Sequence, residues 1–164
     1  MSKEQDYSTD MEAQNIATEL QERFPMFENH DLSRVVFYRM KEKKSRVPTK
    51  ITTTKFPFDA IGGTYIYFVE VYAKVWDFMS DEQRKIAIFE VLVAMHPDGF
   101  DEESNNYAKL RKRDVDEYSE VLCAAQGVYN WKEQGMKVTD IYELARDKEE
   151  EKEDLSEVEE TETQ

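Results

Sequence analysis

The sequence predicts an α+β domain, in which a small antiparallel sheet packs against a central helix. Three segments rich in β-branched and aromatic residues, at 34–40, 49–54 and 64–72, predict strands. One segment with apolar residues at helical spacing precedes them, and further helical segments follow them. Hydrophobic residues make up 40% of the 164 residues, which is enough for a single buried core.

The first helix is expected to start at Asp10 and to end before Pro25, because a proline disfavours helical backbone at the residue before it. Its apolar residues follow the i, i+3, i+4, i+7 spacing of a helix with one buried face: Ala13, Ile16, Ala17, Leu20 and Phe24. The charged turn 41–46 separates the strands 34–40 and 49–54. We predict that these two strands form a hairpin.

The third strand, TYIYFVEVY (64–72), has the strongest strand signal in the chain. Its nearly continuous apolar run predicts burial on both faces, with Glu70 as the exception. The following helix is DEQRKIAIFEVLVAMH (81–96). It begins with a capping box formed by Ser80 and Gln83, and Pro97 and Gly99 stop it.

Two more helices are predicted in the C-terminal part of the chain. The segment 114–131 has an apolar helical face, and a last helix is capped by Thr139 or Asp140. The domain is thus expected at 10–146. A disordered N-terminus at 1–9 precedes it, and an acidic, disordered tail at 147–164 follows it.

The composition excludes several classes of protein. The net charge is −14, of which the tail carries −8 with ten acidic residues and two lysines, so the other 146 residues carry −6. Direct binding of nucleic acid through a cationic surface is therefore not expected. No apolar run approaches the ~20 residues that span a bilayer. The single cysteine, Cys123, fits a reducing compartment, and we expect a cytoplasmic protein.

One segment contrasts with the acidic character of the chain. Residues 39–55 hold seven basic residues and one acidic residue. This segment can be a patch for an acidic partner or for the protein's own tail, or it can simply be a solvated hairpin. The tail allows a different hypothesis, since an acidic protein can mimic the phosphates of DNA and block a DNA-binding defence or repair enzyme.

Three motifs, in this order, resemble the family described as "Putative phage metallopeptidase", a zincin-like group of small proteins. They are YFVEVYAKVW (67–76), DFMSDEQR (77–84) and RDVDEYSEVLCAAQGVYNW (113–131). The resemblance implies a zincin-like fold over residues 12–132. It also implies zinc-dependent hydrolysis, in which two histidines of a HExxH helix bind zinc and the glutamate activates the zinc-bound water. A third ligand is expected just before the Asp-Val of the later helix.

The histidines of that motif are absent from this chain, and two registers are open. Matching glutamate to glutamate places Phe89 and Val93 at the histidine positions. Keeping the spacing from the preceding motif places Glu90 and Ala94 there, with Val91 at the position of the base. In both registers the third ligand position falls on Arg113, a permanent cation that cannot bind a metal. Zinc, and any other cofactor, is therefore not expected.

The candidate site residues follow from this comparison. Glu90 is a relic of the catalytic residue, part of a new surface, or a partner of Arg113. One hypothesis is that Arg113 replaces the metal ion in a charge-assisted pair with Glu90, and the alternative is that both side chains reach solvent. Asp114 starts the later helix, and Glu70 is a charge within an apolar strand. His96 is expected on the same helical face as Phe89 and Val93, and it can pair with Asp98 or Glu102.

We expect a non-catalytic module that binds an unidentified host or phage protein. Two alternatives stay open on the sequence alone. The first is a metallopeptidase with a rearranged site that uses Glu90 and His96. The second is the acidic DNA mimic described above.

Overall fold

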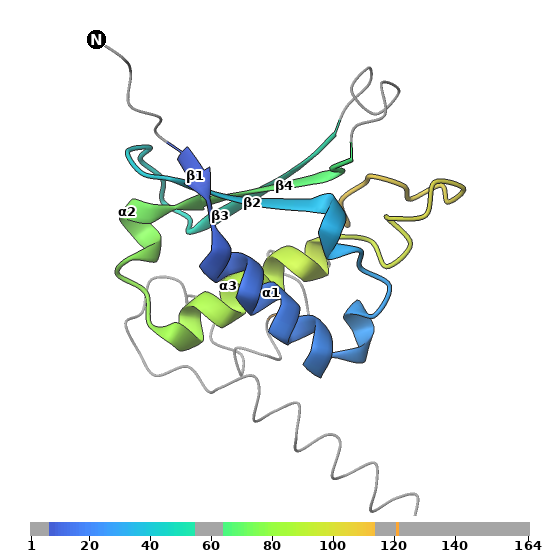
Figure 1. The fold of residues 1–164 in the computed structure, drawn as a ribbon, viewed down its shortest axis with the longest axis horizontal. Coiled ribbons are helices and arrows are strands. Elements are labelled where there is room, and N and C mark those ends of the chain that lie inside the picture. Colours follow the sequence, from blue (N-terminus) through green and yellow to red (C-terminus); the bar gives the residue numbers. More distant parts are fainter. Residues whose placement is uncertain (1–6, 55–63, 114–120, 122–164) are drawn as a thin grey trace, which may run out of the picture.

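The computed structural model describes residues 7–54, 64–113 and 121. Its strands are β1 (Tyr7–Thr9), β2 (Val35–Met40), β3 (Thr49–Thr53) and β4 (Tyr67–Tyr72). Its helices are α1 (Met11–Arg23), α2 (Ala73–Trp76) and α3 (Asp81–Ala94), with short 3₁₀ turns at Pro25–Phe27 and Leu32–Arg34. Helices α1 and α3 cover one face of the sheet (Figure 1), which confirms the predicted α+β class.

The sheet is mixed, so the prediction of an antiparallel sheet was wrong. The strand order is β1-β2-β4-β3, and β2 pairs with β4 in parallel. β1 pairs with β2 and β3 pairs with β4, both antiparallel. The predicted hairpin of β2 and β3 is also absent, because β4 lies between these two strands. β1 itself lies in the segment expected to be disordered, where three exposed residues give no strand signal.

The central strand β4 is fully buried on the face toward the helices and only partly buried on the other face, which corrects the prediction of burial on both faces. Tyr67, Val69 and Val71 are buried against the helices. On the opposite face Tyr72 is buried, whereas Phe68 and Glu70 are half-buried. The same alternation continues on the neighbouring strands, since side chains of successive residues point to opposite faces of a sheet. The open face of the sheet is thus distinct from the face that packs on α3.

The predicted start of α3 is confirmed, but its end is earlier than predicted. Ser80 accepts a hydrogen bond from the N–H of Gln83, and the Gln83 side chain accepts one from the N–H of Ser80. The helix ends at Ala94, and Met95 already has extended backbone. Met95 instead forms an isolated antiparallel bridge with Leu110. His96 is consequently not on the helical face that the sequence predicted.

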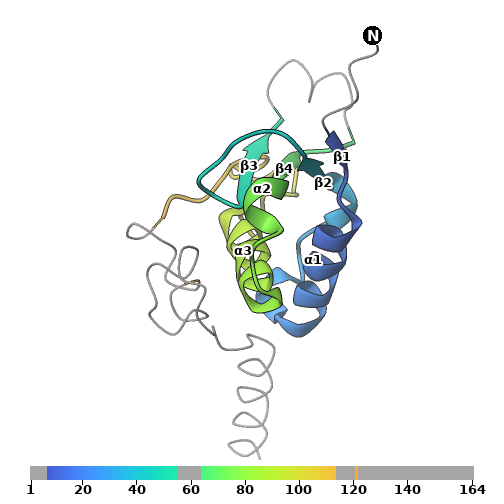
Figure 2. The same ribbon diagram turned by 90° about the vertical axis from the view of Figure 1, so that its left-hand side faces the viewer.

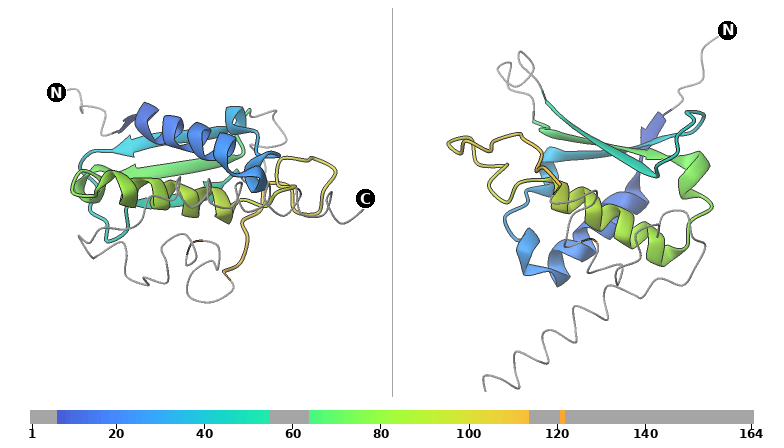
Figure 3. Two further views of the ribbon diagram at one scale, coloured as in Figure 1. Left: turned by 90° about the horizontal axis from the view of Figure 1, so that it is seen from below. Right: turned by 180° about the vertical axis from the view of Figure 1, so that it is seen from behind.

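Charged side chains fix α1 and α3 to the sheet. Arg39 of β2 contacts Asp10, the N-cap of α1, at 2.8 Å and Glu12 at 2.9 Å. Glu12 also contacts Arg84 of α3 at 2.9 Å. The two helices lie side by side beneath the sheet (Figure 2), with α1 beneath β2 and α3 beneath the β4–β3 half (Figure 3). This arrangement places α3 next to the edge strand β3.

His30 holds the last turn of α3 from the core side. Its side chain is 4% exposed, and its Nε2 donates to the carbonyl of Leu92 at 2.9 Å. Burial lowers the pKa of His30, although the hydrogen bond to Leu92 acts in the opposite direction. The other ring nitrogen, Nδ1, is buried without a hydrogen-bond partner among the described residues. The folded protein therefore favours the neutral form of this imidazole more than the unfolded chain does.

This histidine should make stability depend on pH. The unfolded chain binds a proton at His30 below the ordinary pKa of about 6.5, whereas the folded protein binds it only at lower pH because burial lowers the pKa of His30. The contribution of neutral His30 to the free energy of unfolding is thus complete above that pH. It is lost as the pH falls, by at most about 1.4 kcal/mol per pH unit. In urea unfolding at pH 7.5 and 5.5, we expect a flatter dependence for His30→Gln than for the unchanged protein. Parallel curves for the two proteins would contradict this prediction.

Several predictions concern residues outside the described ranges. They include the helices at 114–131 and beyond 139, the acidic tail, Cys123 and Asp114. Among the helices that the structure describes, none has the length and apolar character that crossing a bilayer requires.

Candidate functional site

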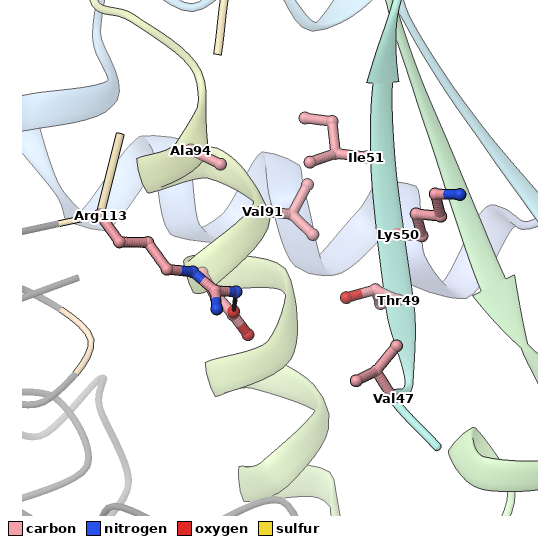
Figure 4. Close-up of a pocket in the computed structure, with 8 residues that line it drawn as sticks. Val47, Thr49, Lys50, Ile51, Val91, Ala94 and Arg113 are labelled. Atoms are coloured by element: carbon pink, nitrogen blue, oxygen red, sulfur yellow. Dashed lines mark hydrogen bonds and ion pairs between the residues drawn. The ribbon is translucent and has the colours of Figure 1, made fainter. Parts of the chain in front are cut away.

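A cavity of about 230 Å³ lies between α3 and the edge strand β3. Helix α3 contributes Glu90, Val91 and Ala94, and Arg113 closes the side remote from the sheet (Figure 4). The wall on the β3 side is formed by Val47, Thr49, Lys50 and Ile51. The side chain of Lys50 points away from α3 (Figure 4), so only the other three wall residues face the helix.

Glu90 and Arg113 form an ion pair at this cavity. Nη2 of Arg113 donates to Oε1 of Glu90 at 2.8 Å. The side chain of Glu90 is 9% exposed and that of Arg113 is 48% exposed. The pair predicted from the sequence is therefore present, and it joins a buried carboxylate to a guanidinium that stays accessible to solvent.

The backbone brings Arg113 to this place. The hydroxyl of Tyr67 donates to the carbonyl of Lys109 at 2.8 Å. Leu110 then forms the bridge with Met95, and the N–H of Arg111 donates to the carbonyl of Ala94 at 2.8 Å. These contacts hold residues 109–111 near the C-terminal end of α3, and Arg113 follows two residues later.

The geometry favours the second of the two registers. Phe89 and Val93 are buried in the core, where the ring of Phe89 packs against Phe24 and Phe27 at 5.1 and 5.3 Å between ring centroids. Glu90, Val91 and Ala94 instead line the cavity, together with Arg113. In this register Glu90 and Ala94 stand at the positions of the two histidines, Val91 at that of the base and Arg113 at that of the third ligand.

The residues at these positions do not fit a zinc ion. A catalytic zinc site needs about three nitrogen, sulfur or oxygen ligands, and Glu90 is the only one of the four residues that can ligate a metal. The guanidinium of Arg113 already contacts its carboxylate. Within residues 7–54, 64–113 and 121, no group of three His, Cys, Asp or Glu side chains has the arrangement of a metal site.

The other predicted site residues lie elsewhere. Glu70 is on the open face of the sheet, where Tyr38 donates to it at 3.0 Å, Lys43 contacts it at 3.1 Å and Tyr72 also donates to it. Burial raises the pKa of Glu70, but hydrogen bonds from Tyr72, Lys43 and Tyr38 outweigh this and leave its pKa lowered. The structure therefore does not bring Glu70 together with Glu90.

His96 lies in the turn after α3 and is half-buried. Asp98, its expected partner, accepts hydrogen bonds from Ser104 and Asn106, which together with the charge of His96 lower the pKa of Asp98. Glu102, the other expected partner, lies 3.8 Å from Arg34. Neither acid forms a site with Glu90.

The edge strand β3 presents backbone groups next to the cavity. The N–H of Tyr72 donates to the carbonyl of Pro48, and the N–H of Thr54 donates to the carbonyl of Ile66. Since hydrogen-bonded pairs alternate along an antiparallel ladder, Lys50 and Thr52 also face β4. The N–H and C=O groups of Thr49, Ile51 and Thr53 therefore face outward, and no strand of the described sheet pairs with them.

The β3 side of this cavity was not predicted from the sequence. A signal was present, because Pro48 stands at the start of the strand and Lys50 within it, and both residues are typical of edge strands. The predicted hairpin obscured that signal, since it paired β3 with β2, whereas β3 pairs with β4.

The fold and the site together define an α+β domain in which an ion pair joins α3 to the segment that ends at Arg113. The family model described as "Putative phage metallopeptidase" matches residues 5–146, more than half of the chain. The chain belongs to this family. No curated protein and no solved structure matches it at a significant level.

Proposed function

We propose that this member of the family binds another protein and does not hydrolyse peptides. The observation that carries the proposal is the ion pair of Glu90 and Arg113 at 2.8 Å, at positions where the family resemblance implies metal ligands. A guanidinium supplies a positive charge there without the Lewis acidity of zinc, and Val91 at the position of the base cannot take up a proton.

The edge strand supplies the mode of binding. An extended peptide can add a strand to a sheet edge, with affinity from backbone hydrogen bonds and specificity from pockets for alternate side chains. The outward groups of Thr49, Ile51 and Thr53 offer the hydrogen bonds, and the cavity beside them offers one such pocket. Val47 is exposed at the cavity mouth and adds apolar surface.

A pair of proline substitutions tests this mode. Thr53→Pro removes an N–H that faces outward, so the pairing of β3 with β4 should persist. Thr52→Pro removes an N–H that faces β4, and we expect a loss of about 1–3 kcal/mol in the free energy of unfolding. In affinity capture, a partner should bind the unchanged protein and should not bind Thr53→Pro. Circular dichroism is the control, and it should show that Thr53→Pro is folded.

Metal analysis of the purified protein separates this function from the alternative enzyme. We expect less than stoichiometric zinc and no zinc-dependent peptide hydrolysis. Stoichiometric zinc and hydrolysis that both disappear in His96→Ala would establish a metallopeptidase with a rearranged site and overturn the proposal.

The proline pair has its own contradicting outcome. Equal capture of the partner by the unchanged protein and by Thr53→Pro would show that binding does not use β3.

A further inference from the structure

Basic side chains flank the cavity beside β3 on both sides, although the chain as a whole carries −14. Lys50 and Arg113 belong to its lining. Arg46 precedes the lining residue Val47, Lys112 precedes Arg113, and both side chains are exposed. Four of the five residues at 109–113 are basic. On an acidic protein, this concentration of positive charge marks a local site for an anionic ligand.

The acidic groups near this region are engaged with other residues. Glu90 contacts Arg113, and Glu70, which is opposite Lys50 in the register of the sheet, contacts Lys43 and two tyrosines. Asp98 in the loop before residue 109 accepts from Ser104 and Asn106. Within the described part of the chain, no ion pair involves Lys50 or Arg46.

Backbone and apolar groups between the charges point to a polypeptide ligand. Nucleic acid has no regular row of hydrogen-bond partners for the outward N–H and C=O groups of β3. It would also place phosphate or sugar against the apolar side chains of Val47, Ile51 and Val91. A strand paired with β3 satisfies the same groups. Its residue opposite Ile51 faces the cavity, and its residue opposite Lys50 faces the open side of the sheet.

We propose that β3 and its cavity bind an extended acidic segment of another protein, in which acidic residues alternate with apolar ones. This inference rests on the proposed function and specifies its partner. An apolar side chain fills the space bounded by Ile51, Val91 and Ala94. The neighbouring carboxylate lies beside Lys50, because cross-strand neighbours of opposite charge attract each other, and Arg113 receives a further carboxylate at the cavity mouth.

The probes are fluorescein-labelled ten-residue peptides with blocked termini, titrated by fluorescence anisotropy against the full chain. One alternates valine with glutamate. Its controls alternate valine with lysine and valine with serine, and a block peptide has the glutamates and valines separated. We expect the glutamate peptide to bind at least about tenfold more tightly than each control. Its binding should also slow hydrogen exchange at the amides of Thr49 and Ile51.

Charge reversal at one residue localises the site. Lys50→Glu should weaken binding of the glutamate peptide about tenfold and strengthen binding of the lysine peptide. Lys41→Glu is the matched control, since Lys41 is exposed in the same basic segment but does not line the cavity, and it should leave both affinities unchanged. Equal effects of the two substitutions would indicate a general charge effect and overturn the inference.

The remaining outcomes separate this inference from the function on which it rests. Equal binding of the glutamate and serine peptides would overturn the acidic specificity and leave strand addition intact. Failure of every peptide to bind would contradict the proposed function as well. A ten-nucleotide oligo(dT) that binds more tightly than the glutamate peptide would identify a nucleic-acid site instead. Tighter binding by a synthetic peptide of residues 147–164 would make the chain's own tail the occupant.

Discussion

The quadruple variant Glu90→His, Val91→Glu, Ala94→His and Arg113→His should bind one equivalent of zinc. These four residues line one cavity, and the changes restore three imidazole ligands and a general base at the positions that the family motif implies. The unchanged protein, purified in the same way, should retain far less zinc. Zinc content and the thermal unfolding temperature measure the effect, since zinc at 100 times its Kd stabilises by about 2.7 kcal/mol.

A variant built on the other register provides the control for this experiment. Phe89→His, Val93→His and Arg113→His also introduces three histidines, and it keeps Glu90 as the base. Its new side chains at 89 and 93 would enter the core, and we expect a loss of about 3–5 kcal/mol for removing the Phe89 ring from its contacts with Phe24 and Phe27. Zinc binding by this variant, and not by the folded quadruple variant, would reverse the choice of register.

The affinity of the quadruple variant should stay below that of a natural zinc enzyme. Histidine ligands are usually oriented by hydrogen bonds from surrounding groups, and the loss of such contacts lowers metal affinity about 10–100-fold. The cavity instead surrounds position 91 with apolar groups such as Ile51 and Ala94. We therefore expect the quadruple variant to bind zinc weakly and to lose it to EDTA. Complete absence of zinc binding would contradict the prediction.

The parts of the fold that could be predicted from sequence depend on neighbours along the chain. The first helix starts at its cap Asp10, where the sequence predicts its start, and Ser80 with Gln83 forms the predicted capping box of α3. These contacts span three residues, so a short window contains all their partners. The strand order depends on pairing between residues far apart, such as Val35 with Tyr67, and no local pattern distinguishes a parallel neighbour from an antiparallel one.

The candidate site was predictable for a different reason. Nothing in the local sequence relates Glu90 to Arg113, which are 23 residues apart, and the family resemblance alone linked them. The resemblance left the register open because only the packing of Phe89 against Phe24 and Phe27 shows which side of α3 faces the core. It was also silent on β3, since this strand contributes to the cavity through its position at the sheet edge.

Removing the guanidinium of Arg113 should destabilise the protein, even though this residue is half-exposed. Arg113→Met leaves the buried carboxylate of Glu90 without this partner. Breaking a fully buried pair costs about 3–5 kcal/mol, and we expect about 1–3 kcal/mol here because solvent reaches the arginine and screens the charge. Urea unfolding measures the loss. A matched control is Lys74→Met, which breaks the pair of Lys74 with Glu42.

The control pair has nearly the same distance, 2.9 Å, but its side chains are 44% and 77% exposed. Its loss should thus stay below about 1 kcal/mol. Glu90→Leu should be nearly neutral or stabilising, since it removes the buried charge, and Arg113→Met should then have little further effect. A double-mutant cycle with no coupling between Glu90 and Arg113 would mean that the arginine does not stabilise the carboxylate. The ion pair would then no longer support a structural replacement for the metal.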